Sequence, residues 1–357
     1  MGAAPAACGR PPATSASCPP GGLPLGLDRQ ADGPADTPLA PATTVRSHED
    51  ILGFRFQVLG STGRIRVAGV PHQRAERFVT AAVAWLRDVE SRLTRFSDKS
   101  LVGALNDRAG IGSVQGDCDL LAVLDAAGRA WRWSAGRLNA TVLPLYRLWH
   151  DAQRTRWPDD REIDEARELV GWEGLVIDGT RVALQRAGMA LDLGGVGKEW
   201  AVDQLIGRAA EAGIADCLVE LGGDCRAAGR QGDHPGWWVA LPGAAMALLL
   251  ADEALATSGL GTRRRHLAGR QVTHLIDART GLPASGAVRS ATILAPTCLV
   301  AGIHASDCCL IDRPSPALIA QRSASHPAWC LDGDGRMIAD HRLAARMHRI
   351  AAGAAGP

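Results

Sequence analysis

The stretch that decides the fold is Asp192-Leu-Gly-Gly-Val-Gly-Lys198-Glu-Trp-Ala-Val-Asp203. We expect a strand to end before it, glycines to let the backbone approach a ligand closely, and a helix to begin within it. The N-terminus of a helix offers free N–H groups and a positive dipole end, which suit an anion such as pyrophosphate. Taken alone, the same glycines are weak evidence for a ligand site and fit a tight turn somewhat better.

The pair Gly197-Lys198 also suggests a phosphate-binding P-loop, but that pattern fails at two positions. Asp192 stands where the first glycine of the loop is required, and Glu199 stands where Ser or Thr would hold magnesium. A P-loop is therefore excluded.

Two further stretches place small residues and hydroxyls where we predict strands to end. They are Glu220-Leu-Gly-Gly-Asp224 and Ala256-Thr257-Ser258-Gly259. Such positions are used where a ligand or a second backbone approaches the chain. Asp224 has a second interpretation, because Asp also caps turns.

The fourth stretch is Thr273-His274-Leu-Ile-Asp277-Ala-Arg-Thr-Gly-Leu-Pro283. A histidine beside Asp and Arg, near anion-binding loops, is typical of an acid–base group. A structural histidine is the alternative.

Working outward, the remaining chain predicts an α+β fold. Alternating apolar residues predict a hairpin over residues 51–67, helical spacing predicts a helix from 79 to 93, and a strand at 288–294 precedes a helix at 298–311. Helices and strands do not alternate strictly, which disfavours a doubly wound sheet. We predict one domain over residues 49–345, with mixed sheets and flanking helices, between a disordered tail rich in Pro, Ala and Gly (1–48) and a C-terminal tail (346–357).

Composition narrows the function classes. The net charge is only +1 and no apolar run reaches the roughly 18 residues of a membrane span, so we expect neither nucleic acid nor a membrane as partner. The nine cysteines show no CxxC pair or zinc spacing, which predicts reduced, mostly buried thiols. Ala-Ala-Cys8 is weakly similar to a lipoprotein cleavage site. No signal-peptide pattern precedes it, so we expect a cytoplasmic protein, or a periplasmic, membrane-anchored one if the start codon is misassigned.

In their order along the chain, the four stretches resemble the ApbE family, the FAD:protein FMN transferases. The family pattern is roughly D-L-G-G-I-A-K-G-x-A-V-D, L-G-G-D, A-T-S-G and H-I-I-D-P-R-T-G-x-P. Upstream segments also fit: residues 59–62 resemble M-G-T, 96–100 with Asn106 resemble S-x-x-N, and 136–142 resemble G-x-F-D-P-T-V. The resemblance covers about residues 50–340 and implies a single ApbE-like, T-fold-related domain.

The resemblance implies a magnesium-dependent reaction. FAD is cleaved at its pyrophosphate, FMN is attached to a Thr or Ser of an acceptor flavoprotein, and AMP is released. It implies that His274, with Asp277 beside it, assists the acceptor hydroxyl. The residues that it implies for binding FAD are Gly194, Gly195, Lys198, Asp203, Thr257, Ser258, Gly259 and His274.

The family's metal site is where this chain departs from the pattern. The resemblance implies a backbone carbonyl at Gly197 and a hydroxyl at Ser306 as ligands, but Gly302 replaces the ligand Asp. Asp307 lies about 140° further around the helix and is not expected to substitute for it. We expect an Asp placed at 302 to increase magnesium-dependent AMP release from FAD without harming the fold.

Glu199 for Gly, Glu220 for Asn and Asn139 for Asp are further departures. Three functions stay open: an active transferase, a degenerate relative that binds FAD without transfer, and a protein of this fold that binds no flavin.

Overall fold

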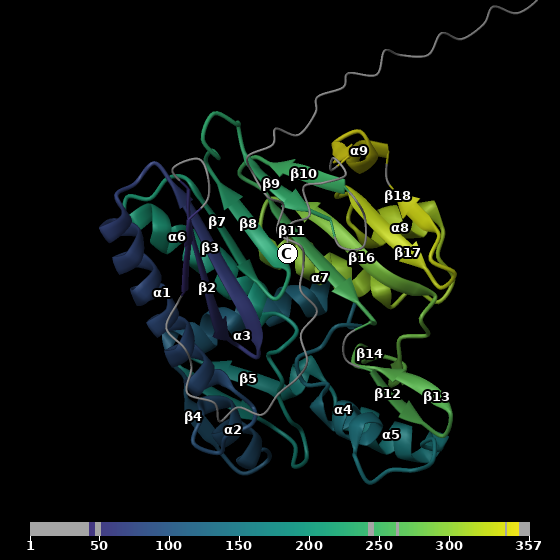
Figure 1. The fold of residues 1–357 in the computed structure, drawn as a ribbon. Helices are drawn as coiled ribbons and strands as arrows, with labels where there is room; N and C mark the ends of the chain where they lie inside the picture. The colour runs from purple at the N-terminus through teal and green to yellow at the C-terminus, as the bar shows by residue number, and fades with distance from the viewer. Residues whose placement is uncertain (1–42, 47–50, 242–245, 262–263, 340, 350–357) are drawn as a thin grey trace, which may run out of the picture.

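The computed structural model describes residues 43–46, 51–241, 246–261, 264–339 and 341–349 (Figure 1). Most of the predicted N-terminal tail and residues 350–357 lie outside this range. Strand β1 (Thr43–Arg46) belongs to the predicted tail, yet it pairs with β2. Strand β19 (Met347–Arg349) likewise falls in the predicted C-terminal tail and pairs with β10. The described fold therefore extends past both boundaries that we predicted.

A nine-stranded sheet forms the centre of the molecule, in the order β1-β2-β3-β7-β8-β11-β16-β17-β18. Neighbouring strands in it all pair antiparallel. With helices grouped on one face, the architecture is α+β, as predicted. The strands after β1 are β2 (Ile51–Val58), β3 (Ser61–Ala68), β7 (Cys217–Leu221), β8 (Asp224–Ala228), β11 (Ala254–Gly259), β16 (Val288–Ala295), β17 (Ala328–Asp332) and β18 (Met337–Ala339).

The predicted hairpin is confirmed as β2 and β3. Leu59 and Gly60 join the two strands with φ of 53° and 61°. Positive φ at both central residues is the requirement of a type I′ turn, whose twist matches that of the strands. The turn places Ser61 at the start of β3, at the edge of the site described below.

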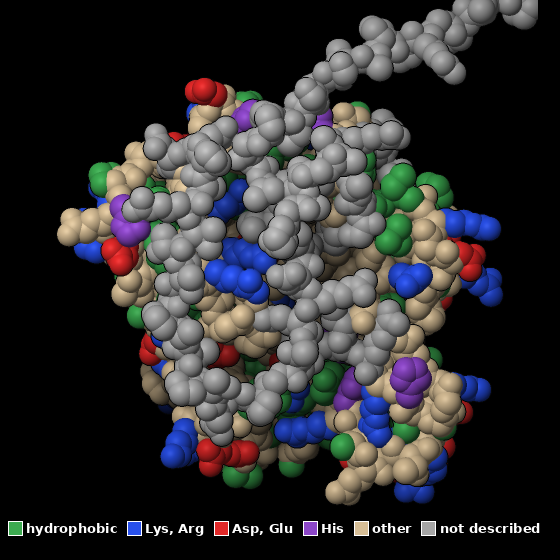
Figure 2. Space-filling view, in the orientation of Figure 1, with side chains coloured by type: hydrophobic (Ala, Val, Ile, Leu, Met, Phe, Trp, Pro, Cys, Tyr) green, Lys and Arg blue, Asp and Glu red, His purple; other side chains and the backbone are tan. Residues whose placement is uncertain are grey.

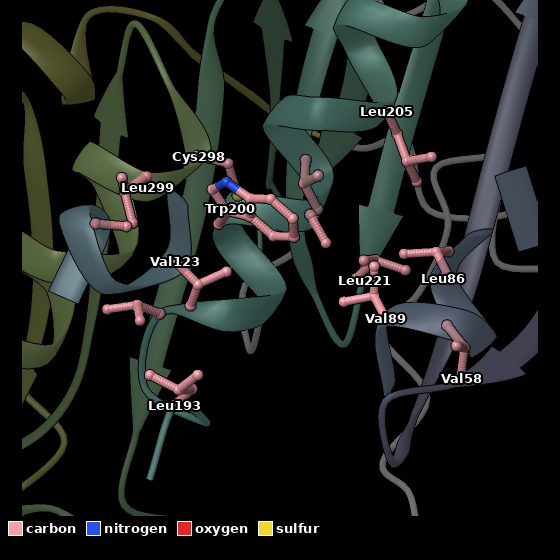
Figure 3. Packing of buried hydrophobic residues seen from close by; sticks show 14 of the residues in the cluster. Val58, Leu86, Val89, Val123, Leu193, Trp200, Leu205, Leu221, Cys298 and Leu299 are labelled. Carbon is pink, nitrogen blue, oxygen red and sulfur yellow. The ribbon is translucent and has the colours of Figure 1, made fainter. Parts of the chain in front are cut away.

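Helices α1 (His72–Leu93), α6 (Gly197–Glu211) and α7 (Cys298–Cys309) pack on one face of the sheet (Figure 1). Figure 3 shows the core beneath them, where Trp200 of α6 lies beside Cys298 at the start of α7. Helices α2 (Leu101–Asp107) and α3 (Cys118–Trp133) contribute to the same core. The helix predicted at 298–311 is thus confirmed as α7, two residues shorter.

A second layer covers the opposite face of the sheet. It consists of β9 (Trp237–Ala240), β10 (Met246–Leu250) and β19. In β7, Val219 packs toward the helices, whereas Leu218 packs with the β9–β10 layer. Both faces of β7 are therefore covered, and all five of its residues are buried, Glu220 included.

A small lobe extends from the sheet. It is built around Trp149, whose indole donates a 2.7 Å hydrogen bond to the carbonyl of Gly281. Its elements are α4 (Leu143–His150), α5 (Asp160–Glu168), β12 (Arg264–Leu267), β13 (Arg270–Thr273), β14 (Ile276–Asp277) and β15 (Leu282–Pro283). The other described elements are β4 (Ser113–Gln115), η1 (Trp172–Gly174), β5 (Leu175–Asp178), β6 (Arg181–Leu184), α8 (Pro316–Arg322) and α9 (His341–Ala344).

Two expectations from composition can be compared with the described residues: the absence of a membrane span, and reduced, mostly buried thiols. None of their helices combines the length and the apolar character needed to cross a membrane. Their seven cysteines are free thiols, and all except Cys118 are buried. On the face shown in Figure 2, basic side chains gather near the centre and acidic side chains lie toward the rim.

Candidate functional site

Three of the four predicted stretches meet on the helix-covered side of the sheet. The N-terminus of α6, the turn between β7 and β8, and the end of β11 come together there, and α7 packs over them. The fourth stretch, with His274, lies at the junction between the sheet and the small lobe.

The glycine loop before α6 is held by its flanks. The side-chain amide of Asn106 donates to the Leu191 carbonyl at 3.1 Å and accepts from the Leu191 N–H at 2.6 Å. Asp192 forms an ion pair with Arg95 at 2.9 Å and accepts from the N–H of Gly194, also at 2.9 Å. This bracing leaves Gly194 and Gly195 exposed, and no described side chain caps α6. The N–H groups of Val196 and Gly197 both donate to the Leu193 carbonyl, at 3.1 and 2.9 Å. Anion binding by the rest of the loop stays a prediction.

Lys198 extends from this loop to the turn between β7 and β8. Gly222 and Gly223 have φ of 64° and 99°, a conformation that favours glycine. A β-carbon on Gly222 would lie 3.0 Å from Oγ of Ser61 and 3.5 Å from Cε of Lys198. The hairpin tip, the glycine turn and the lysine are thus in close contact.

Asp224 does more than cap a turn. Its carboxylate is 6% exposed and accepts a 2.9 Å hydrogen bond from the N–H of Thr257, which links β8 to β11. Burial, and then the charge of Glu199, raises the pKa of Asp224, while Lys198 acts in the opposite direction. Lys198, Glu199 and Asp224 therefore form one cluster of charges.

Hydroxyl groups line the end of β11. Oγ1 of Thr257 lies 2.9 Å from Oγ1 of Thr292, and the hydroxyl of Ser306 donates to that of Ser258 at 3.3 Å. Gly259 ends the strand beside Ser290. The structure thus brings Ser258, predicted to bind FAD, together with Ser306, predicted to bind the metal.

Asp203 lies on α6, but its carboxylate is bonded to other parts of the protein. Oδ1 accepts from the Arg226 guanidinium at 2.8 Å and from the Cys298 N–H at 2.9 Å, and Oδ2 accepts from the Leu299 N–H at 3.0 Å. These bonds join α6 to β8 and to the first turn of α7. In this structure Asp203 positions the helices that carry the site.

His274 lies in the bend after β13 and is half-buried. The hydroxyl of Thr273 anchors this bend by donating to the carbonyl of Leu275 at 3.2 Å. Asp277 closes the next turn, because its Oδ1 accepts from the N–H of Arg279 at 2.9 Å. One oxygen of Asp277 is therefore occupied by the turn.

The carboxylate of Asp307 is bonded to two arginines. This agrees with our expectation that it does not substitute for the missing Asp at 302. The guanidinium of Arg137 donates to both of its oxygens, at 2.6 and 2.8 Å, and Arg322 donates to Oδ1 at 2.8 Å. Burial raises the pKa of Asp307 to about 6 against the effect of Arg137, and the charge of Asp277 adds to the rise. Asp277 thus lies close enough to α7 for its charge to affect the pKa of Asp307.

The contact between Glu199 and Gly302 was not foreseen. A β-carbon at 302 would lie 2.6 Å from Cγ of Glu199 and 3.1 Å from its Cδ and Oε1. Real β-carbons essentially never approach another atom so closely, so an Asp at 302 would displace a side chain that is 7% exposed. The Glu199 side chain must therefore shift in Gly302→Asp, which our expectation for this variant did not include. Spacing within α7 could not reveal the contact, because Glu199 comes from α6.

Within the described ranges, no three or more His, Cys, Asp or Glu side chains are grouped to hold a metal. The predicted ligands are the backbone carbonyl of Gly197 and the hydroxyl of Ser306. Neither belongs to a His, Cys, Asp or Glu side chain, so neither would appear in such a group. One oxygen of Glu199, Oε2, is buried and accepts no hydrogen bond from any described residue. A buried carboxylate oxygen without a donor, beside hydroxyl and carbonyl oxygens, fits a hard cation such as magnesium.

The fold and site define an α+β protein with a glycine-lined, oxygen-rich site between a sheet and two helices. The sequence over residues 59–328 matches the ApbE family, and the chain belongs to that family. It is 30% identical over 279 residues to the FAD:protein FMN transferase of Treponema pallidum, covering 70% of this chain and 76% of that protein. It is 27% identical over 281 residues to the FAD:protein FMN transferase of Klebsiella pneumoniae, covering 75% and 79% of the two chains.

Solved structures show the same fold. Flavin transferase ApbE from Vibrio cholerae superposes with a TM-score of 0.70 at 24% identity, covering 86% of this chain and all of the other. The ApbE protein of Thermotoga maritima gives a TM-score of 0.73 at 22% identity, covering 86% and 99%. The family and α+β fold predicted from the sequence are thereby confirmed.

Proposed function

We propose that this protein is a FAD:protein FMN transferase. An acceptor Thr or Ser hydroxyl attacks the FMN phosphorus of FAD, the pyrophosphate P–O bond breaks, and AMP leaves. The hydroxyl loses its proton, and a phosphoester joins FMN to the acceptor protein. The observation that carries this proposal is the convergence of three separate family stretches on one site.

The residues of the site suit this reaction. The N-terminus of α6, which no described side chain caps, and Lys198 would neutralise phosphate charge. Bound magnesium, held by the carbonyl of Gly197, Ser306 and a carboxylate, would supply further charge neutralisation for the pyrophosphate. Thr257, Ser258 and Gly259 offer hydroxyls and open backbone to the flavin side. His274 is assigned to take the proton of the acceptor hydroxyl.

The test uses chromatography to measure the AMP released from FAD. The mixture contains magnesium and an acceptor protein whose Thr is free and becomes flavinylated. A fluorescent, covalently flavinylated acceptor band should appear in step with AMP. FAD binding without AMP or flavinylation would contradict the proposal.

One observation favours a second function. Gly302 removes the carboxylate that the family pattern places in the metal site. A relative that binds FAD but transfers nothing would show saturable FAD binding and no AMP at any magnesium concentration.

A further inference from the structure

Two departures from the family pattern touch each other. The pattern has glycine at the position of Glu199 and Asp at that of Gly302. Here Cγ, Cδ and Oε1 of Glu199 lie 2.6, 3.1 and 3.1 Å from the place where a β-carbon of residue 302 would be. The side chain on α6 therefore occupies the volume that an Asp on α7 would fill. The two changes therefore compensate each other. The family pattern has glycine on α6 and a carboxylate on α7, whereas this chain has a carboxylate on α6 and glycine on α7.

The carboxylate of Glu199 is buried, and one of its oxygens lacks a hydrogen-bond donor among the described residues. The residue is 7% exposed, and its Oε2 accepts no hydrogen bond from the described part of the chain. Lys198 precedes it in the chain, and a second carboxyl group, Asp224, interacts with it through charge and through a side-chain hydrogen bond. Buried carboxylates are usually paired, hydrogen-bonded or bound to a metal. An oxygen with no donor beside another acidic group indicates a place for a cation.

Other oxygens surround the same volume. Ser306 follows Gly302 by one helical turn, so their β-carbon positions are about 5–6 Å apart on one face of α7. Its hydroxyl lies 3.3 Å from that of Ser258. Gly197, whose carbonyl the family resemblance assigns to the metal, is two residues before Glu199 on α6. Carboxylate, hydroxyl and carbonyl oxygens are the ligands that magnesium prefers.

We infer that Glu199 is the carboxylate ligand of the metal site and replaces, from α6, the Asp that is missing at position 302. This inference rests on the proposed function, since the metal is the one that the transfer reaction requires. It also removes the main argument for a degenerate relative, because the site keeps its carboxylate.

Metal binding tests the inference without using activity. Mn²⁺ is titrated into the full-length protein, with and without saturating FAD, and free Mn²⁺ is followed by electron paramagnetic resonance. Mg²⁺ competition gives its affinity. The variants are Glu199→Gln, Glu199→Gly, Gly302→Asp and the double exchange Glu199→Gly with Gly302→Asp. Glu211→Gln, which removes an exposed carboxylate at the far end of α6, is the control.

We expect wild type and Glu211→Gln to bind one Mn²⁺ per chain. Glu199→Gln keeps the shape of the side chain and should weaken Mn²⁺ binding about tenfold or more. Glu199→Gly should bind as weakly, whereas the double exchange should recover an affinity within a few-fold of wild type. Gly302→Asp alone should not bind more tightly, because Glu199 already fills the space.

The alternative is a buried pair in which Glu199 and Asp224 share a proton and bind no metal. Mn²⁺ affinity unchanged in Glu199→Gln and Glu199→Gly would establish that alternative and overturn the inference. So would a folded double exchange that stays as weak as Glu199→Gly, or a wild type that binds no Mn²⁺ with or without FAD. FAD binding measured on the same samples separates the two claims, because loss of the proposed function would appear as absence of FAD binding in every protein.

Discussion

At the scale of single residues, a substitution of His274 can distinguish a catalytic role of this side chain from a structural one. It lies half-buried in a bend held by Thr273. If it takes the proton of the acceptor hydroxyl, His274→Ala should lower the rate of AMP release by about 10²-fold or more. FAD affinity and melting temperature should change little. His266→Ala, an exposed histidine on the same hairpin, is the control. A His274→Ala enzyme of wild-type rate would make this histidine structural.

Gly302 supports a prediction about packing that needs no ligand. Glycine-to-alanine changes inside helices usually stabilise by about 0.5–1 kcal/mol. At 302 the added methyl would lie 2.6 Å from Cγ of the buried Glu199, so we expect Gly302→Ala to destabilise by about 1–3 kcal/mol instead. Gly207 in α6 is exposed and open, and Gly207→Ala should follow the ordinary rule. Chemical denaturation of both variants measures the contrast; a stabilised Gly302→Ala would show that Glu199 moves aside freely.

At the scale of elements, Asp203 connects α6 with α7. It receives two N–H groups from the start of α7 and the guanidinium of Arg226. Asp203→Ala leaves those donors without their acceptor, so we expect a loss of about 2–3 kcal/mol in unfolding free energy. Asp203→Asn keeps one oxygen and should lose less. The measurement is denaturant unfolding monitored by tryptophan fluorescence. Equal stability of Asp203→Ala and wild type would contradict the linking role.

Elements with strong periodicity could be predicted, and weak ones could not. The β2–β3 hairpin, β7 and α7 follow from alternation, apolar runs and helical spacing in the sequence. Strand β8, with sequence Asp-Cys-Arg-Ala-Ala, has little intrinsic preference for a strand and forms because β7 and β11 pair with it. Helix α5 was missed although Asp159 and Glu162 form a capping box, a signal that was present in the sequence.

The same division holds for the site. The glycine loop, the LGGD turn and the hydroxyls of β11 could be found because each is a local pattern. The partners of Asp203 lie 23, 95 and 96 residues away, and no local pattern reveals them. Glu199 and Gly302 were each recognised as departures. Their contact depends on how two helices pack, so only the structure shows that one departure complements the other.

At the scale of the whole molecule, the site joins segments from α6, β7, β8, β11 and α7, so a ligand bound there should stabilise the entire fold. FAD at about 100 times its dissociation constant stabilises by about 2.7 kcal/mol, which raises the melting temperature of a domain of this size by roughly 4 °C. FMN lacks the AMP half, so Lys198 and the N-terminus of α6 should then hold one phosphate rather than a pyrophosphate. We therefore expect a smaller shift with FMN than with FAD at equal concentration, measured by calorimetry with and without magnesium. Equal shifts for FMN and FAD would mean that the site does not hold the AMP half. No shift with either would mean that this fold binds no flavin, and the transferase proposal would then fail along with it.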